Sequence, residues 1–284
     1  MTIMQGQAPH LLSVIIAARN EAGYIGKCLN SILKQDDEAG PVEVIVVANA
    51  CTDNTAEVAL AARPGVEARG WDLYVIEDPT PGKIHALNTG DRAAVGDVLV
   101  YLDADVVCDT DLFGALRNVL AIDEPLYATG TLQVTAARSW ITRQYARFWQ
   151  RLPFVQGGAV GAGLFAVNRV GRSRWQEFPE IISDDTYVRL HFTPQERIEV
   201  SPKYHWPMVE GRSALIKVRR RQDDGVAEIA RLYPELVGND DKDRLSKTGV
   251  IGLFLKDPVG FVVYGCVSAA VRLSPTSKQW TRGR

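Results

Sequence analysis

The sequence of 284 residues contains only four cysteines, and none of them forms a Cys-x-x-Cys pair. This scarcity excludes a disulfide framework, argues against a zinc site and is typical of a protein in a reducing cytosol. The first ten residues have no Lys or Arg and no apolar run, so we expect no secretory signal. The net charge is only −2, which gives no argument for nucleic-acid binding.

Three familiar nucleotide-binding motifs are also missing. A P-loop would need Gly in place of Glu77 and Ser or Thr in place of Ile84. A dinucleotide-binding fold would need a glycine-rich turn after the first strand, where the chain has Ala18-Arg19-Asn20. A sugar nucleotidylyltransferase would carry a glycine-rich loop with Arg at the same place. None of these three classes is favoured.

What the first hundred residues do contain is an alternation of two periodicities. Short apolar runs predict buried strands, and amphipathic stretches between them predict helices. Strands alternating with helices indicate βαβ units, so we predict an α/β fold with a mainly parallel, Rossmann-like sheet covered on both faces. The predicted strands are Leu12–Ala17, Val42–Val47, Leu73–Glu77 and Val98–Leu102, and the predicted helices are 25–33, one beginning at Thr52–Asn54, and Lys83–Ala94.

The regular alternation of predicted strands and helices ends at about Leu126. We predict a strand, an aromatic helix, a glycine-rich segment at 157–163, a helix from Ser183 to Leu190, a basic helix and a charged linker. We therefore divide the chain into a domain of residues 1–235 and a linker with an apolar and basic extension at 236–284. Within the domain, 12–110 would bind the nucleotide and 111–235 the acceptor. The second-half elements are Tyr127–Thr135, the helix with Trp140, Tyr145, Phe148 and Trp149, the helix with Lys217–Arg221, and the linker Asn239–Lys247.

Two carboxylates follow the fourth predicted strand. Asp103 and Asp105 are two residues apart, so both side chains can face one point from an extended chain. Two hard oxygen donors suit Mg²⁺ or Mn²⁺, which would neutralise a diphosphate. Taken alone, an Asp-x-Asp tripeptide is more often a turn or a helix cap than a metal site. The neighbouring sequence elements are what favour the metal site here.

Those surroundings consist of five elements in order along residues 12 to 190. Together they resemble the family-2 glycosyltransferases, which have the GT-A fold, and the ordered set is more specific than any one of its members. The matching elements are Val14–Glu21, Val46–Thr55, Gly82–Asn88, Tyr101–Asp105 and Asp184–Asp185, with Gly161–Gly163 upstream of the last.

The resemblance implies a role for each matched residue. Asp103 and Asp105 would hold the Mn²⁺ or Mg²⁺ ion, and Asp185, with Asp184 beside it, would act as general base on the acceptor hydroxyl. Asp184 alternatively serves as a helix N-cap. The residues implied for the nucleotide sugar are Ala18, Arg19, Glu21, Asn49, Lys83, Asp103, Ala104 and Arg221, and those implied for the acceptor are Gly161, Gly163 and Trp149.

The sequence departs from the family pattern in three places, of which the mildest is Asp184-Asp185 in place of the family's Glu-Asp pair. Asn49 stands where many relatives carry an acid, which weakens the choice of uracil over guanine, although we still favour a UDP-sugar. The Arg-Trp motif of processive members is absent, which favours a single transfer. The arginines near Arg221 grip the diphosphate, bind lipid headgroups or form a solvated face, and the three interpretations stay open. His205 is either a further metal ligand or, as is more common for a lone histidine, structural.

The carboxyl-terminal stretch from Gly249 to Leu273 is mostly apolar and is interrupted by Lys256-Asp257-Pro258. Its longest uninterrupted part has thirteen residues, which is short of the roughly 20 needed to span a bilayer. No acid follows Pro258, whereas four basic residues do, so we expect a peripheral position on the inner face of the cell membrane. A core helix or an oligomer contact is the alternative. The four basic residues are Arg272, Lys278, Arg282 and Arg284.

The sequence therefore predicts a metal-dependent, inverting glycosyltransferase. Its donor would be a nucleotide-diphosphate sugar, with UDP favoured, and its acceptor a hydroxyl of a glycan or a lipid-linked sugar. The alternatives are a GDP-sugar transferase, such as a mannosyltransferase, and a catalytically inactive domain that serves as a binding or scaffold module.

Overall fold

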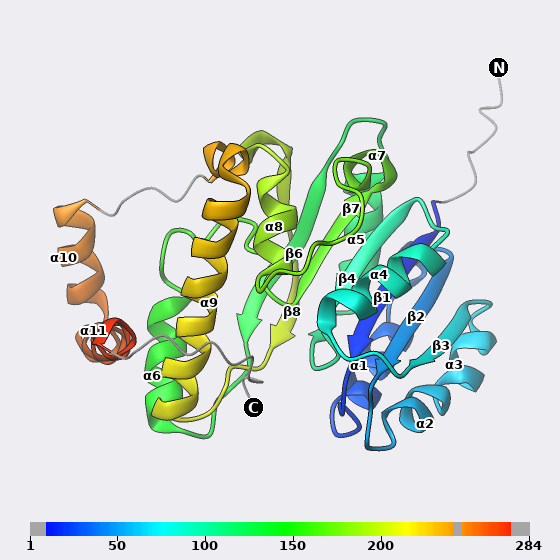
Figure 1. Cartoon of the computed structure of the whole chain (residues 1–284), viewed down its shortest axis with the longest axis horizontal. Helices are drawn as coiled ribbons and strands as arrows, with labels where there is room; N and C mark the ends of the chain where they lie inside the picture. Colours follow the sequence, from blue (N-terminus) through cyan, green and yellow to red (C-terminus); the bar gives the residue numbers. More distant parts are fainter. Residues whose placement is uncertain (1–9, 241–245, 274–284) are drawn as a thin grey trace.

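A mixed sheet of eight strands organises this computed structural model, which describes residues 10–240 and 246–273 (Figure 1). Its strands are β1 (Leu12–Ala18), β2 (Val42–Asn49), β3 (Asp72–Asp78), β4 (Val98–Leu102), β5 (Val107–Cys108), β6 (Tyr127–Val134), β7 (Leu164–Asn168) and β8 (Arg197–Trp206). The α-helices are α1 (Ile25–Leu33), α2 (Thr55–Leu60), α3 (Arg63–Ala68), α4 (Lys83–Ala93), α5 (Leu112–Leu120), α6 (Trp140–Trp149), α7 (Arg169–Arg172), α8 (Asp184–Leu190), α9 (Arg212–Leu232), α10 (Lys247–Lys256) and α11 (Pro258–Leu273).

The strand order explains where a site can form. The sheet runs β3-β2-β1-β4-β7-β6-β8-β5, and the first four of these strands are parallel. β7 is antiparallel to both of its neighbours, β4 and β6, and β8 is parallel to β6. The carboxyl ends of β4, β6 and β8 therefore meet the beginning of β7 at one edge, the edge where parallel α/β sheets place their ligands.

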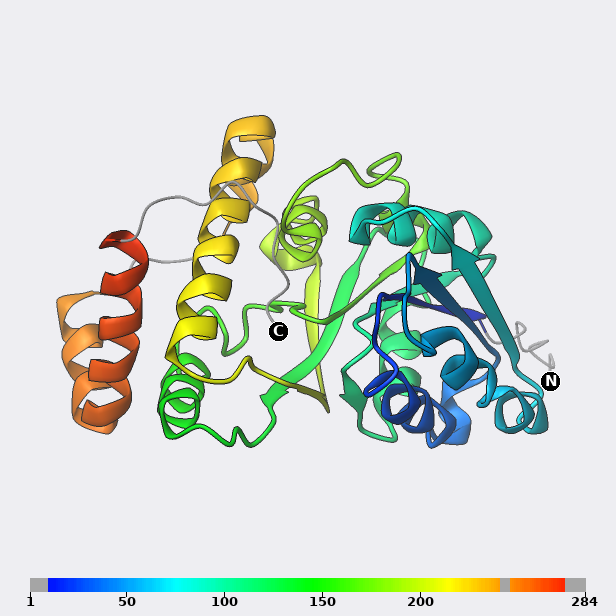
Figure 2. The same ribbon diagram turned by 60° about the horizontal axis from the view of Figure 1, so that its bottom comes forward.

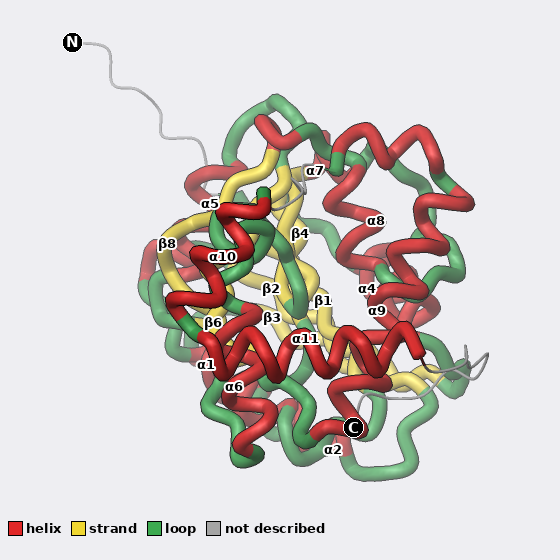
Figure 3. Tube along the Cα trace, turned by 90° about the vertical axis from the view of Figure 1, so that its left-hand side faces the viewer, coloured by secondary structure: helices red, strands yellow, loops and turns green. Residues whose placement is uncertain are grey.

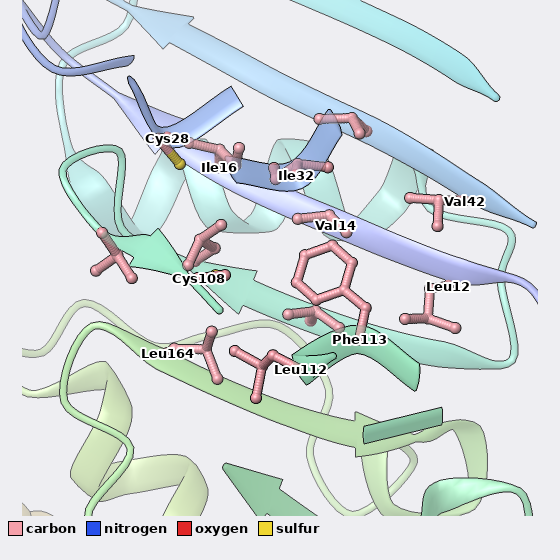
Figure 4. Packing of buried hydrophobic residues seen from close by; sticks show 14 of the residues in the cluster. Leu12, Val14, Ile16, Cys28, Ile32, Val42, Cys108, Leu112, Phe113 and Leu164 are labelled. Atoms are coloured by element: carbon pink, nitrogen blue, oxygen red, sulfur yellow. The ribbon is translucent and has the colours of Figure 1, made fainter. Parts of the chain in front are cut away.

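Each face of the sheet buries its own hydrophobic cluster. Along β1, Leu12, Val14 and Ile16 point to one face, and Ile15 points to the other, as the two-residue period of a strand requires. Helices α1 and α5 cover the first face (Figure 4), and α4 and α8 cover the second. Burial on both faces explains the continuous apolar runs that predicted these strands.

A third cluster lies beyond the sheet and joins α6, α9 and α11 around Trp149, Leu215 and Val267. Figures 1 and 2 place α10 and α11 at the end of the molecule opposite β3. Among the residues that the structure describes, no single helix is long and apolar enough to cross a bilayer. Taken together, α10 and α11 have sufficient length and apolar composition, but they are bent by 119° at their junction.

The predicted α/β fold is confirmed, and the predicted elements of the first half match the observed ones closely. The strand β8 and the strand β7 were not predicted, because the glycine-rich segment before β7 and Pro202 within β8 weaken the pattern. Part of the predicted linker, residues 241–245, lies outside the described residues, as do Lys278, Arg282 and Arg284 of the basic end.

One buried carboxylate ties three elements of the parallel core together. Glu43 of β2 is 4% exposed. It accepts hydrogen bonds from the Ser13 hydroxyl of β1 and from the backbone N–H of Val95, 2.7 Å away. Gly96 N–H donates to the same Ser13 hydroxyl at 2.8 Å, so the turn before β4 is held against β1 and β2.

We predict that Glu43→Ala lowers the free energy of unfolding by about 2 to 4 kcal/mol, because it leaves buried donors without an acceptor. Urea unfolding measures the change. Glu77→Ala on the exposed side of β3 is the matched control and should change the value by less than about 0.5 kcal/mol. Equal effects of the two variants would show that Glu43 does not hold the turn.

Candidate active site

A cavity of about 330 Å³ opens at the sheet edge where β4 ends. The end of β4, the start of α4, the start of α8 and the middle of α9 all contribute to its walls. A neighbouring cavity of about 170 Å³ shares several of the same side chains. The residues common to both are Ala17, Glu21, Lys83, Asp103, Asp105 and Arg221.

The antiparallel strand β7 positions the first aspartate of the Asp103-Ala104-Asp105 motif. Leu102 pairs with Leu164, so the residues just beyond each strand, Asp103 and Gly163, lie opposite each other. The Asp103 N–H donates to the Gly163 carbonyl at 2.8 Å. Gly163 has a φ of +81°, and a Cβ there would lie 2.6 Å from Cδ1 of Trp206. Only glycine fits this position, because both the backbone and the space exclude a side chain.

Lys83 links the two pairs of aspartates. Its ammonium Nζ lies 3.1 Å from Oδ1 of Asp103 and 3.0 Å from Oδ2 of Asp184. Burial by itself would lower the pKa of Lys83, but Asp103, Asp184 and Asp185 outweigh it, so the pKa is raised and the side chain stays charged. This cation allows four carboxylates to gather around one cavity.

Asp185 has the chemistry of a general base. Burial, and next the neighbouring Asp184, raise its pKa to about 6, whereas Lys83 and the N–H of Thr186 act in the opposite direction. The Thr186 N–H donates to Oδ1 of Asp185 at 2.6 Å, which fixes one oxygen of the carboxylate. A carboxyl group that titrates near pH 6 is a stronger proton acceptor than an ordinary aspartate and is still ionised at neutral pH.

Asp184 does not cap α8, which is the structural role that the sequence allowed. Ser183 occupies the N-cap position of this helix, and Asp184 is buried with its carboxylate against Lys83. Its burial next to Asp185 raises the pKa of the latter through like-charge repulsion. Asp184 therefore raises the pKa of Asp185 and holds the ammonium group of Lys83.

The donor set suits Mn²⁺ or Mg²⁺. Asp103 and Asp105 line the same two cavities and offer hard carboxylate oxygens. In residues 10–240 and 246–273, no group of three or more His, Cys, Asp or Glu side chains could hold a metal ion. Two carboxylates are nevertheless sufficient where a bound diphosphate and water complete the octahedron, which is how Mg²⁺ commonly binds.

On the nucleotide side, Asn49 fixes the turn that presents Lys83. Its side-chain amide donates to the Gly82 carbonyl at 2.9 Å, and α4 begins directly after that glycine, whose φ is +133°. Arg19 and Glu21 line the smaller cavity with Asn49 and Ala104. From the opposite wall, Arg221 of α9 reaches both cavities, so one arginine of the basic cluster belongs to the site.

Four predicted residues lie elsewhere. His205 does not line either cavity, and its Nε2 lies 2.9 Å from Oδ1 of Asp109. Ala18 is fully buried in the core, whereas its neighbour Ala17 lines the cavity. Trp149 packs against Trp206, with ring centroids 6.1 Å apart, and Gly161 leaves room for the Tyr127 hydroxyl, which a Cβ would approach to 1.8 Å. Trp149 and Gly161 therefore contact residues next to the cavity and do not line it themselves.

The sequence interpretation missed the aromatic part of the wall. Trp206 lines the cavity where His205 was considered, because neighbouring residues of a strand point to opposite faces. Tyr101 and Phe165, stacked with centroids 4.8 Å apart on adjacent strands, also line it. A strict two-residue period places Tyr101 on the same side of the chain as Asp103 and would have found Tyr101.

The chain belongs to glycosyl transferase family 2, because the sequence model of that family matches residues 13–174. Similar curated proteins include glycosyltransferase AglE of Haloferax volcanii, 39% identical over 94 residues, and 4,4'-diaponeurosporenoate glycosyltransferase of Staphylococcus aureus, 37% identical over 99 residues. These stretches span 33% and 34% of this chain, and 30% and 24% of the two relatives.

Solved structures share the fold over nearly the whole chain. The mannosyltransferase PcManGT from Pyrobaculum calidifontis, in complex with GDP-Man and Mn²⁺, has a TM-score of 0.56 at 21% identity, covering 94% of this chain and 76% of that one. TarS 1-349 of Staphylococcus aureus, in complex with UDP, has a TM-score of 0.52 at 18% identity, covering 92% and 80%. The predicted GT-A fold and family are thus confirmed.

We predict that Asp185→Asn stabilises the folded protein at pH 7.5 by on the order of 2 to 3 kcal/mol and has a much smaller effect near pH 4. The raised pKa means that the folded state holds the Asp185 proton more tightly than the unfolded state does. The wild type is therefore penalised as pH rises from about 4 through 6. Urea unfolding at both pH values tests this, with the exposed Asp72→Asn as control. A pH-independent effect of Asp185→Asn would contradict the assignment.

Proposed function

We propose that the protein transfers a sugar from a nucleotide-diphosphate donor to an acceptor hydroxyl, with inversion at the anomeric carbon. One observation carries this proposal: Asp103, Asp105, Lys83 and Asp185 face the same cavity. Asp103, Asp105 and Lys83 have the charges needed to bind a diphosphate and its cation. Asp185 has a carboxylate that can accept a proton. Membership of glycosyl transferase family 2 supports the transferase class.

In the proposed reaction, Asp185 accepts the proton of the acceptor hydroxyl while that oxygen forms its bond to the anomeric carbon. The bond from the same carbon to the diphosphate breaks on the opposite side, so the configuration inverts. A divalent ion bound at Asp103 and Asp105 would stabilise the negative charge on the leaving diphosphate. Lys83 and Arg221 add positive charge to the site, since both line the two cavities.

For the donor, a UDP-sugar remains our preference and a GDP-sugar the alternative. The neighbouring structures include one with GDP-Man and one with UDP, so the fold accommodates either base. For the acceptor, Trp206 and the stacked pair of Tyr101 and Phe165 provide aromatic surface in the cavity, which suits the apolar face of a sugar ring. A glycan or a lipid-linked sugar fits this wall. An inactive scaffold is disfavoured because all of the acidic residues of the site are present.

We predict that Asp105→Asn reduces metal-dependent release of nucleotide diphosphate by about 100-fold or more, because it removes one of two charged ligands of the cation. A panel of UDP- and GDP-sugars with Mn²⁺ is screened first by thermal shift, where a bound ligand raises Tm by mass action. Turnover is then measured with the stabilising donor. Asp111→Asn, exposed at the start of α5, is the control. If the wild type releases no nucleotide diphosphate from any donor, the scaffold interpretation is correct.

We predict that kcat/KM falls as pH drops through about 6, because Asp185 must be ionised to accept a proton. Lys83→Met should move this acidic limb to higher pH as well as lowering the rate, since the ammonium lowers the pKa of Asp185. The exposed Lys27→Met of α1 is the matched control. An acidic limb at the same pH in Lys83→Met and wild type would remove Asp185 from the role of base.

A further inference from the structure

Helix α10 buries none of its residues, although it is rich in large apolar side chains. Ile251 and Leu255 are 57% and 73% exposed, and Phe254 is 42% exposed. An isolated ten-residue helix is only marginally stable in water, because most helical stability comes from packing an apolar face. The outward face of α10 therefore lacks a covering surface within residues 10–240 and 246–273.

Helix α11 continues the same exposed surface on one side while packing on the other. Val267 and Val271 are buried, and Phe261 and Tyr264 pack against Phe148 of α6. Val259 and Val262 are 46% and 55% exposed. Figure 3 shows α10 and α11 lying together on the outer face of the molecule. We call the exposed side chains of Ile251, Phe254, Leu255, Val259 and Val262 the apolar elbow.

Ion pairs between two half-exposed arginines and a buried carboxylate link the junction of α10 and α11 to the α6 segment. Asp257, at the junction, is 3% exposed. Its Oδ2 accepts from Arg147 Nε at 2.8 Å, and Arg151 Nη1 lies 3.1 Å from the same oxygen. Its Oδ1 also accepts from the Gly260 N–H at 2.9 Å, which caps the first turn of α11. The hydrogen bonds from Arg147 hold the pKa of Asp257 below its usual range. The junction is therefore anchored to the rest of the protein at the point where the two helices bend by 119°.

Within residues 246–273 the exposed charged side chains are all positive. Between residues 246 and 273 the only acid is Asp257, which is buried, whereas Lys247, Lys256 and Arg272 are all exposed. Arg147 and Arg151 are themselves about half exposed and share that one carboxylate, so they add further positive charge. Exposed apolar side chains flanked by cations match an anionic lipid surface, into which the apolar groups insert while the cations meet the headgroups.

We propose that the apolar elbow docks the protein onto an anionic lipid bilayer, with α10 and α11 lying in the interface and not crossing it. A second copy of the chain is a poorer occupant. A twofold contact would place the same cations against one another without any accessible acid in 246–273 to pair with them. This surface lies outside the catalytic cavity, so the proposal stands apart from the choice of donor and acceptor.

Vesicle flotation of the full chain tests the proposal. The vesicles are pure phosphatidylcholine or contain about 30 mol % phosphatidylglycerol, an anionic lipid. We expect binding to the anionic vesicles that is at least about tenfold tighter than to the neutral ones and that weakens as salt rises. Leu255→Ser/Val262→Ser should lose at least about tenfold in vesicle affinity, because two apolar side chains no longer enter the lipid.

The matched control is Leu60→Ser/Val95→Ser, which removes two exposed apolar side chains from the opposite half and should bind as the wild type does. Thermal unfolding of both double variants confirms that each is folded. Lys247→Ser/Lys256→Ser should lose several-fold on anionic vesicles and show a weaker salt dependence.

The proposal is overturned if the wild type floats with neither vesicle, if it binds both equally, or if Leu255→Ser/Val262→Ser binds as tightly as the control. Light scattering without lipid gives the remaining test. A wild-type dimer that Leu255→Ser/Val262→Ser converts to a monomer would show that a second copy covers the elbow. If the wild type, Leu255→Ser/Val262→Ser and Leu60→Ser/Val95→Ser are all monomers, the result supports the lipid surface as the partner of the elbow.

Discussion

The candidate active site depends on the ion pairs that the ammonium group of Lys83 forms with the surrounding aspartates. The ammonium group lies about 3 Å from both Asp103 and Asp184, with Asp185 close by. Like charges gathered in a partly desolvated cavity would repel one another, and a cation among them reduces that cost. The same cation leaves Asp185 with a pKa of about 6, which is high enough for a base and low enough for ionisation at neutral pH.

The sheet topology brings these groups together. β4 delivers Asp103 and Asp105, the antiparallel β7 begins beside them at Gly163, and β8 ends nearby at Trp206. Reversing β7 between the parallel strands β4 and β6 places its beginning at the edge where these neighbours end. The charged side and the aromatic side of the cavity therefore meet at one edge, although about a hundred residues separate Asp103 from Trp206.

Much of the site could be predicted from short local patterns. Asp103, Asp105 and Lys83 each stand at the end of a strand or the start of a helix, where apolar runs and a preceding glycine are visible in the sequence. The strands of the second half were harder to predict, because β8 contains a proline and β7 follows a glycine-rich segment. His205 illustrates the limit: the right segment was chosen, but the strand turns His205 toward Asp109 and Trp206 toward the cavity.

The sequence by itself determined the α/β class, the family and the identity of the principal carboxylates, because these follow from periodicity and from motifs within a few residues of one another. Only the tertiary structure decided which side chains share a cavity, since contacts such as Lys83 with Asp184, or Asp103 with Gly163, join distant segments. It also decided that Asp257 is buried against two arginines, at the junction where the carboxyl-terminal helices bend. An ion pair between remote residues leaves no periodic trace in a sequence, because it depends on how the surrounding helices pack.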